Sequence, residues 1–238
     1  MVSMPDYRDF DSISMLTIID GTLVNETPLR VGVGGEPLLG SPVDIVVYRV
    51  NGKPCIPGSS LKGVLRSLAE ALAKSRGINV HDPWEKDAVE KEEKEGNFCE
   101  ICGIFGNTEL ASHIKIYDSM PKGPKDARTF YKYGIAIDRD FGSVRSGLGP
   151  FVEEFVEPGL EWSLRMDMLN IEVFPEPKAG DLRALLIRDL LNIMHTFGIQ
   201  VGARKSVGAG LIRLKEARWK VYRLKNGKLE LSSKGDLI

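Results

Sequence analysis

The segment Ile56-Pro57-Gly58-Ser59-Ser60-Leu61-Lys62-Gly63-Val64-Leu65-Arg66 joins an extended stretch to a helix. Upstream of it, strand-like residues 45–50 are followed by Asn51-Gly52, the commonest two-residue hairpin turn, and by a short second strand. Downstream, apolar residues recur at helical spacing from Leu61 to Leu72, and Gly77 is placed to end the helix. We therefore expect a β-hairpin followed by an amphipathic helix with a serine at its cap.

The rest of the chain alternates between strand-like and helical patterns. A second helix is expected over 181–196 because six apolar residues recur there at helical spacing and Gly198 follows. Strands are expected at 14–24, 113–117, 160–173, 211–214, 219–224 and 229–231. Residues 81–96 are charged and poor in apolar side chains, which indicates a solvated insertion, and residues 134–156 indicate a protruding hairpin or loop. This order suits an α+β sheet with helices on one face.

Composition narrows the class of protein further. The chain has 238 residues, 42% of them hydrophobic, and a net charge of -1, so any affinity for nucleic acid would come from a local groove. No stretch approaches the ~20 apolar residues that span a bilayer. The N-terminus lacks a basic start followed by an apolar run, so we expect no secretory signal and a cytoplasmic location.

Two short segments carry side chains suited to binding. Gly202-Ala203-Arg204-Lys205-Ser206-Val207-Gly208-Ala209-Gly210 combines three glycines, which would leave amide groups bare, with two cations. That combination binds phosphate oxygens, although a glycine-rich turn with two solvated cations explains the loop equally well. Cys99 and Cys102 have the CxxC spacing of a metal or redox centre, and three cysteines do not make a disulfide framework.

Several motifs, taken in order, resemble those of the CRISPR-associated RAMP proteins. They are 56–66, 99–106, 117–121, 134–142 and 202–210, and the resemblance runs from about Leu16 to about Leu214. It is strongest to the repeated backbone subunit of type III effector complexes. The resemblance implies one domain over 1–238, with a ferredoxin-like, RRM-related core, an inserted zinc or lid segment at about 77–110 and a projecting thumb hairpin at about 138–156. Such subunits stack as a filament along a guide RNA.

The resemblance also assigns RNA contacts. The helix start at Ser59 and the loop at 202–210 would hold RNA phosphates, in agreement with helix N-termini and bare amides as anion sites. The residues expected to touch RNA are Ser59, Lys62, Arg66, Gly202, Arg204, Lys205, Ser206 and Gly208. For Lys62 and Arg66, a solvated helix face is the alternative.

Asp44 resembles the aspartate with which such subunits cut target RNA. A carboxylate can hold Mg²⁺ or Mn²⁺ near the scissile phosphate, or orient the 2′-hydroxyl that attacks it. An aspartate at a strand start or turn is the structural alternative. In the thumb, Phe141, Arg145 and Leu148 resemble the hairpin that wedges between guide and target, but an exposed apolar loop can equally be a subunit interface.

Cys99 and Cys102 resemble two ligands of a structural zinc, with His81 as the nearest histidine and no evident fourth ligand. His113 and His195 do not resemble a nuclease base. The resulting hypothesis is a subunit that binds guide CRISPR RNA, target single-stranded RNA, copies of itself and other effector subunits, and that has no membrane partner. The alternatives are a non-cleaving capping subunit, a guide-processing endoribonuclease, which is disfavoured because no histidine precedes His81, and a small zinc-ribbon module.

Overall fold

A six-stranded antiparallel sheet forms the body of the protein in a computed structural model that describes residues 7–32, 43–123, 127–145 and 150–237. The strands follow the order β10-β9-β1-β7-β4, and β8 pairs with β9. Their bounds are β1 Met15–Asn25, β4 Ile114–Ile116, β7 Glu161–Leu169, β8 Ile199–Gln200, β9 Leu211–Lys225 and β10 Lys228–Asp236. The expected α+β class is confirmed, and the strands predicted at 211–214 and 219–224 are one continuous strand, β9.

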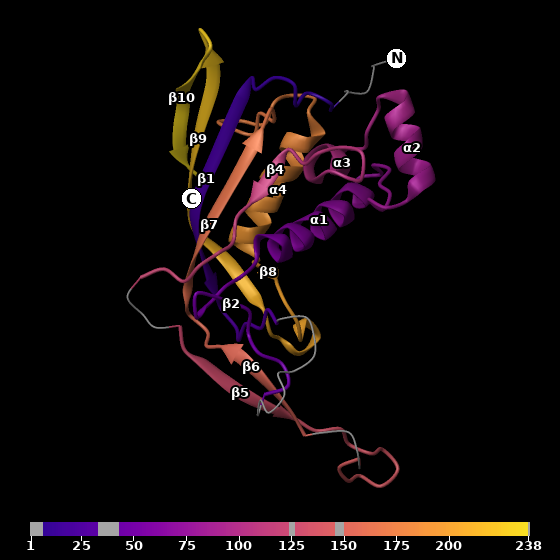
Figure 1. Cartoon of the computed structure of the whole chain (residues 1–238), viewed down its shortest axis with the longest axis vertical. Helices are drawn as coiled ribbons and strands as arrows, with labels where there is room; N and C mark the ends of the chain where they lie inside the picture. The colour runs from indigo at the N-terminus through magenta and orange to yellow at the C-terminus, as the bar shows by residue number, and fades with distance from the viewer. Residues whose placement is uncertain (1–6, 33–42, 124–126, 146–149, 238) are drawn as a thin grey trace.

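Two helices, α1 (Gly58–Ser75) and α4 (Leu182–Thr196), cover one face of this sheet (Figure 1). Side chains alternate along β1, so that Ile19, for example, is fully buried between Met166 of β7 and Trp219 of β9. The apolar stripes of both helices close the core above these side chains. None of the helices in the described ranges is long and apolar enough to cross a bilayer.

The start of α1 differs from the sequence expectation. The helix begins at Gly58 with Pro57 at the cap position, so no serine caps it. Instead, the Gly58 N–H donates a 2.8 Å hydrogen bond to Oδ1 of Asp118, which lies just after β4. Glycine is needed at position 58 because a Cβ there would lie 2.2 Å from the Ile116 carbonyl oxygen. The N-terminus of α1 is therefore satisfied by a side chain from a distant segment.

Between α1 and β4 the chain forms two further helices, α2 (Lys86–Glu95) and α3 (Glu100–Phe105). The prediction of a solvated insertion is correct for the surface of α2, where Val89 is the one buried residue, but it missed the helix itself. Because α2 has almost no apolar stripe, hydrophobic periodicity gave no signal for it.

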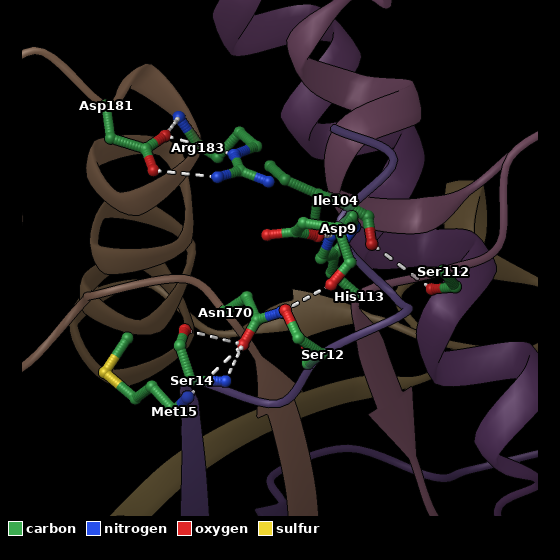
Figure 2. Close-up of polar contacts among 10 residues, drawn as sticks. All are labelled: Asp9, Ser12, Ser14, Met15, Ile104, Ser112, His113, Asn170, Asp181 and Arg183. Carbon is green, nitrogen blue, oxygen red and sulfur yellow. Dashed lines mark hydrogen bonds and ion pairs between the residues drawn. The ribbon is translucent and has the colours of Figure 1, made fainter. Parts of the chain in front are cut away.

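The N-terminal segment 7–14 contacts α3 and α4 through Tyr7, whose ring packs beside Gly103 and Arg183, and its polar contacts are shown in Figure 2. Asn170 accepts hydrogen bonds from Ser14 and Met15 through its side-chain oxygen, and its amide donates to the Asp9 carbonyl at 2.8 Å. The Asp9 carboxylate lies 2.7 Å from Nε2 of the fully buried His113. These contacts tie the segment to the start of β4 and the end of β7.

The thumb is the hairpin formed by β5 (Thr129–Gly134) and β6 (Phe151–Val156), and it projects below the sheet (Figure 1). Its paired strands begin at Thr129, upstream of the expected boundary at 138. The small hairpin of β2 (Arg49–Val50) and β3 (Lys53–Pro54) forms at the predicted Asn51-Gly52 turn. Residues 45–48, expected to continue its first strand, instead make single bridges to Gly32 and Glu153.

Candidate nucleic-acid interface and metal cluster

Asp44 lies beside β6, the return strand of the thumb. Its N–H donates to the Val152 carbonyl at 3.0 Å, and its Oδ2 accepts from the Val152 N–H at 2.6 Å. Ile45 then runs parallel to Glu153 of the same strand. Asp44 is exposed, so its carboxylate combines one structural hydrogen bond with access to solvent.

The glycine-bearing loop 202–210 packs against residues 28–30, which follow β1. The Ala203 N–H donates to the Arg30 carbonyl at 3.0 Å, and the Gly210 N–H donates to the Pro28 carbonyl at 2.8 Å. Gly202 is in the left-handed region, at φ 83°, and a Cβ there would lie 2.1 Å from the Arg30 carbonyl oxygen. The expectation that the glycines leave bare amides is therefore wrong for Gly210, and also for Gly208, whose N–H is bonded to the Lys205 carbonyl at 3.0 Å.

The side chains of this loop face outward around the short 3₁₀ turn Lys205–Val207. Lys205, Ser206 and Val207 are exposed. Arg204 donates from Nε to both carboxylate oxygens of Glu153 on β6, at 2.9 and 3.2 Å. The loop thus retains its two cations, one of them held against the thumb.

The three residues of α1 that were predicted to contact RNA differ in exposure and in hydrogen bonding. Ser59 is exposed and Lys62 is half-buried, and burial together with the nearby Arg66 charge lowers the pKa of the Lys62 ammonium. Arg66 is bonded to Glu70 at 2.9 Å and to the Gly106 carbonyl at 2.6 Å. A contact between Arg66 and RNA would require it to leave these partners.

Two adjacent acids of β6 were not identified from the sequence. Glu153 contacts Arg30 and Arg204, whereas Glu154 accepts hydrogen bonds from Arg49 at 2.8 and 2.5 Å and from the Val47 N–H at 3.0 Å. Burial alone would raise the pKa of Glu154, but the hydrogen bonds from Arg49 and Val47 reverse this and lower it to about 2. The pair therefore joins β6 to the segments that carry Asp44 and the loop 202–210.

The outer part of the thumb is exposed and apolar. Phe141 is 84% exposed and follows an Asp138-anchored turn, and Tyr133 on β5 is 73% exposed. Arg145 is also exposed, and its N–H donates to the Ala136 carbonyl at 2.9 Å. Leu148, the third predicted thumb residue, lies outside the described residues. Exposed aromatic side chains of this kind can stack on bases or bury themselves in a partner.

A second cluster joins α2 and α3 through His81, Glu92, Cys99 and Cys102, whose ligand atoms all lie within 4.8 Å of one another. His81 Nε2 is 2.9 Å from Glu92 Oε1 and 3.7 Å from Cys102 Sγ. Ligands around a tetrahedral zinc are separated by roughly 3.3–3.8 Å, given bond lengths of about 2.0–2.3 Å. The three predicted ligands lie close together, and the structure adds Glu92, which the sequence did not reveal, as a fourth side chain that could hold a metal.

Two details of this cluster suit a cation. Oε2 of Glu92 is buried and has no hydrogen-bond partner, which is costly for a carboxylate oxygen. His81 Nδ1 lies 2.9 Å from the Asp82 carbonyl, which directs Nε2 toward the cluster. Burial lowers the pKa of His81, but the Asp82 carbonyl and the charges of Cys99 and Glu92 outweigh it and raise the pKa. The hydrogen bond between the cysteines lowers the pKa of Cys102 and raises that of Cys99.

The remaining cysteine and histidine side chains lie outside this cluster. Cys55 is buried, and burial raises the pKa of its thiol to about 11. His195 Nδ1 lies 3.0 Å from the Leu214 carbonyl. Neither His195 nor the buried His113 belongs to the cluster of His81, Glu92, Cys99 and Cys102 in the described residues.

Comparison with known proteins gives matches of three kinds. A family model described as the RAMP superfamily matches residues 22–213. Over 97 residues the chain is 35% identical to the "CRISPR system Cms endoribonuclease Csm3" of Methanocaldococcus jannaschii, which covers 37% of this chain and 34% of that protein. A chain in the structure titled "Cryo-EM structure of the Type III-B Cmr-beta bound to cognate target RNA" matches 91% of this chain with a TM-score of 0.53 and 19% identity.

The chain spans about a third of the curated relative and 60% of the structural neighbour. At 19% identity, the structural likeness concerns the fold alone. The family match covers most of the sequence, including the helices α1 and α4 and the thumb.

Proposed function

Because this chain belongs to the RAMP superfamily, we propose that it is a backbone subunit of a type III CRISPR effector complex, which holds guide RNA and cuts the target RNA paired to it. The observation that carries the proposal is the convergence of Asp44 and the loop 202–210 on one strand, β6. An exposed carboxylate and a cationic loop thereby flank the outer end of the paired strands β5 and β6, in a hairpin that can contact nucleic acid.

The order of elements supports a ferredoxin-like core for this subunit. The chain runs β1-α1-β4-β7-α4-β9, and these strands lie in the order β9-β1-β7-β4. This is a βαββαβ arrangement, with α2, α3 and the thumb as insertions. Guide RNA would lie along Ser59, Lys62, Arg204 and Lys205, with copies of the same subunit stacked along it.

For cleavage, Asp44 would accept or orient the proton of a ribose 2′-hydroxyl, whose oxygen then attacks the adjacent phosphorus. The bond to the 5′-oxygen of the next nucleotide breaks and that oxygen takes a proton from water, so the products end in a 2′,3′-cyclic phosphate and a 5′-hydroxyl. In the described residues, Asp44 is not part of a group of three close metal ligands. A single carboxylate still fits Mg²⁺ or Mn²⁺, since such ions take their other ligands from water and RNA phosphates, and a bound ion would neutralise phosphate charge.

Zinc is the metal that we propose for His81, Glu92, Cys99 and Cys102. The mixed nitrogen, sulfur and oxygen donors suit Zn²⁺, and the site would join α2 to α3 as a structural cross-link. Elemental analysis of the purified protein tests this, with one zinc per chain as the expected result.

The cleavage proposal is tested with the natively purified effector complex, Mg²⁺ and a labelled target RNA. Asp44→Ala is expected to abolish cutting while guide RNA remains bound, and the wild type is expected to give fragments at a fixed spacing. Asp236→Ala, on the exposed edge strand β10, is the matched control and should cut normally. If Asp44→Ala cut like the wild type, Asp44 would only anchor Val152, and the subunit would be structural.

A further inference from the structure

Two consecutive acids of β6, Glu153 and Glu154, are buried. Neighbouring side chains of a strand point to opposite faces, so Glu153 and Glu154 reach different segments. Their side chains are 7% and 4% exposed. A carboxylate is kept at such a position only when it is paired, because an unpaired buried charge is very costly.

Glu153 is shared by two arginines. Arg30, itself buried, hydrogen-bonds to Oε1 from the segment after β1, and Arg204 approaches from the loop 202–210. One arginine is enough to neutralise one carboxylate, so the three side chains together keep a net positive charge. Arg204 is the outer member, with 40% of its side chain exposed.

The guanidinium of Arg204 has a defined orientation. Both hydrogen bonds to Glu153 come from Nε, and the Phe151 ring centroid lies 5.2 Å from its Cζ. A guanidinium has five N–H donors, so a carboxylate that takes the Nε edge leaves donors on the outer edge for a second anion. Arg204 also lines a cavity of about 210 Å³ between the thumb and the loop, together with Lys132, Phe151 and Val207.

We infer that Glu153 is a positioning residue for RNA: it holds the Arg204 guanidinium at the rim of this cavity, so that the outer edge meets a backbone phosphate. The inference rests on the proposed RNA-binding role of the loop. It predicts that a negative charge next to the RNA strengthens RNA binding. Glu153 is an acid in an RNA-binding surface, yet it strengthens binding, because ordering Arg204 in advance outweighs its own repulsion of phosphate.

The test measures the affinity of the full-length protein for labelled single-stranded RNA by fluorescence anisotropy at several NaCl concentrations. Arg204→Ala is expected to weaken binding roughly tenfold, the loss of about one charge-assisted hydrogen-bond pair. Glu153→Gln is expected to weaken binding by at least ~3-fold, although simple charge removal predicts tighter binding. The double variant should bind no more weakly than Arg204→Ala alone.

Glu154→Gln is the matched control. It changes the neighbouring buried acid of the same strand, whose arginine partner is Arg49 and not Arg204. RNA affinity should therefore not fall in Glu154→Gln, even if this variant loses as much thermal stability as Glu153→Gln. A loss of affinity common to both variants would show that β6 matters only for folding and would overturn the inference.

Arg204→Lys avoids any problem of folding, because the residue is exposed and the charge is kept. A lysine cannot bridge Glu153 and a phosphate as a fork does, so this variant should bind nearly as weakly as Arg204→Ala. Affinity like that of the wild type would overturn the inference, as would tighter binding by Glu153→Gln. If Arg204→Ala itself bound RNA as the wild type does, the assignment of the loop to RNA, and not only the role of Glu153, would be wrong.

Discussion

Replacement of Asp118 by alanine should destabilise the protein through the N-terminus of α1. The Asp118 carboxylate accepts the 2.8 Å hydrogen bond of Gly58 and stands at the positive end of the helix dipole. Loss of a capping side chain costs about 1 kcal/mol, and loss of a negative charge at this end adds about 0.5 kcal/mol. For a domain of this size, about 1.5 kcal/mol corresponds to a fall in Tm of roughly 3–6 °C.

Thermal unfolding followed by circular dichroism or calorimetry measures this effect. Asp118→Asn keeps an oxygen acceptor and loses only the charge, so its Tm should fall by about a third as much. Asp236→Ala, which removes a mostly exposed carboxylate on β10, should change stability by less than about 0.5 kcal/mol. The capping account would be refuted if Asp118→Ala had the same Tm as the Asp236→Ala control. It would also be refuted if Asp118→Asn lowered Tm as much as Asp118→Ala.

Three more predictions concern the N-terminal segment and the metal cluster. Gly103→Ala should cost about 1–3 kcal/mol and speed hydrogen exchange of residues 7–14, because the new Cβ would lie 2.4 Å from the Tyr7 ring; unchanged exchange would contradict this. Chelation of zinc, or Cys99→Ser, should lower Tm and remove the bound metal, and a metal-free wild type would refute the site. Burial holds the pKa of His113 below its value of about 6.5 in the unfolded chain. As the pH drops below about 6.5, the unfolded chain therefore binds the proton first, and the free energy of unfolding should fall. His113→Gln should flatten this part of the plot of stability against pH.

Elements with a strong apolar period could be predicted from the sequence. The helices α1 and α4 and the strands β1 and β7 each bury one face in the common core, so their periodicity reports their structure directly. The helix α2 could not be found this way because it has a single buried residue, Val89. The conformation of α2 depends instead on the residues at its two ends and on the contacts of Glu92. No local sequence pattern encodes those contacts.

The candidate site residues were also found only in part from the sequence. Asp44, Arg204 and Lys205 were singled out through motif resemblance, but the partners of Asp44 and Arg204 come from β6, and Val152 lies more than a hundred residues from Asp44 along the chain. Two consecutive acids in the otherwise apolar run Phe151–Val156 were a usable signal, because a strand that buries both must supply a cation on each face. Glu92 gave no such signal, since it lies among several similar acids.

The dependence of RNA affinity on salt tests the central claim most directly. If cations of α1 and of the loop 202–210 hold a ribose-phosphate strand, log K for single-stranded RNA should fall linearly with log [NaCl], by about 0.7 for each phosphate contact. Lys205→Ala should reduce that slope by roughly one contact without changing sequence preference. Absence of measurable RNA binding, or an affinity that does not change with salt, would contradict the account.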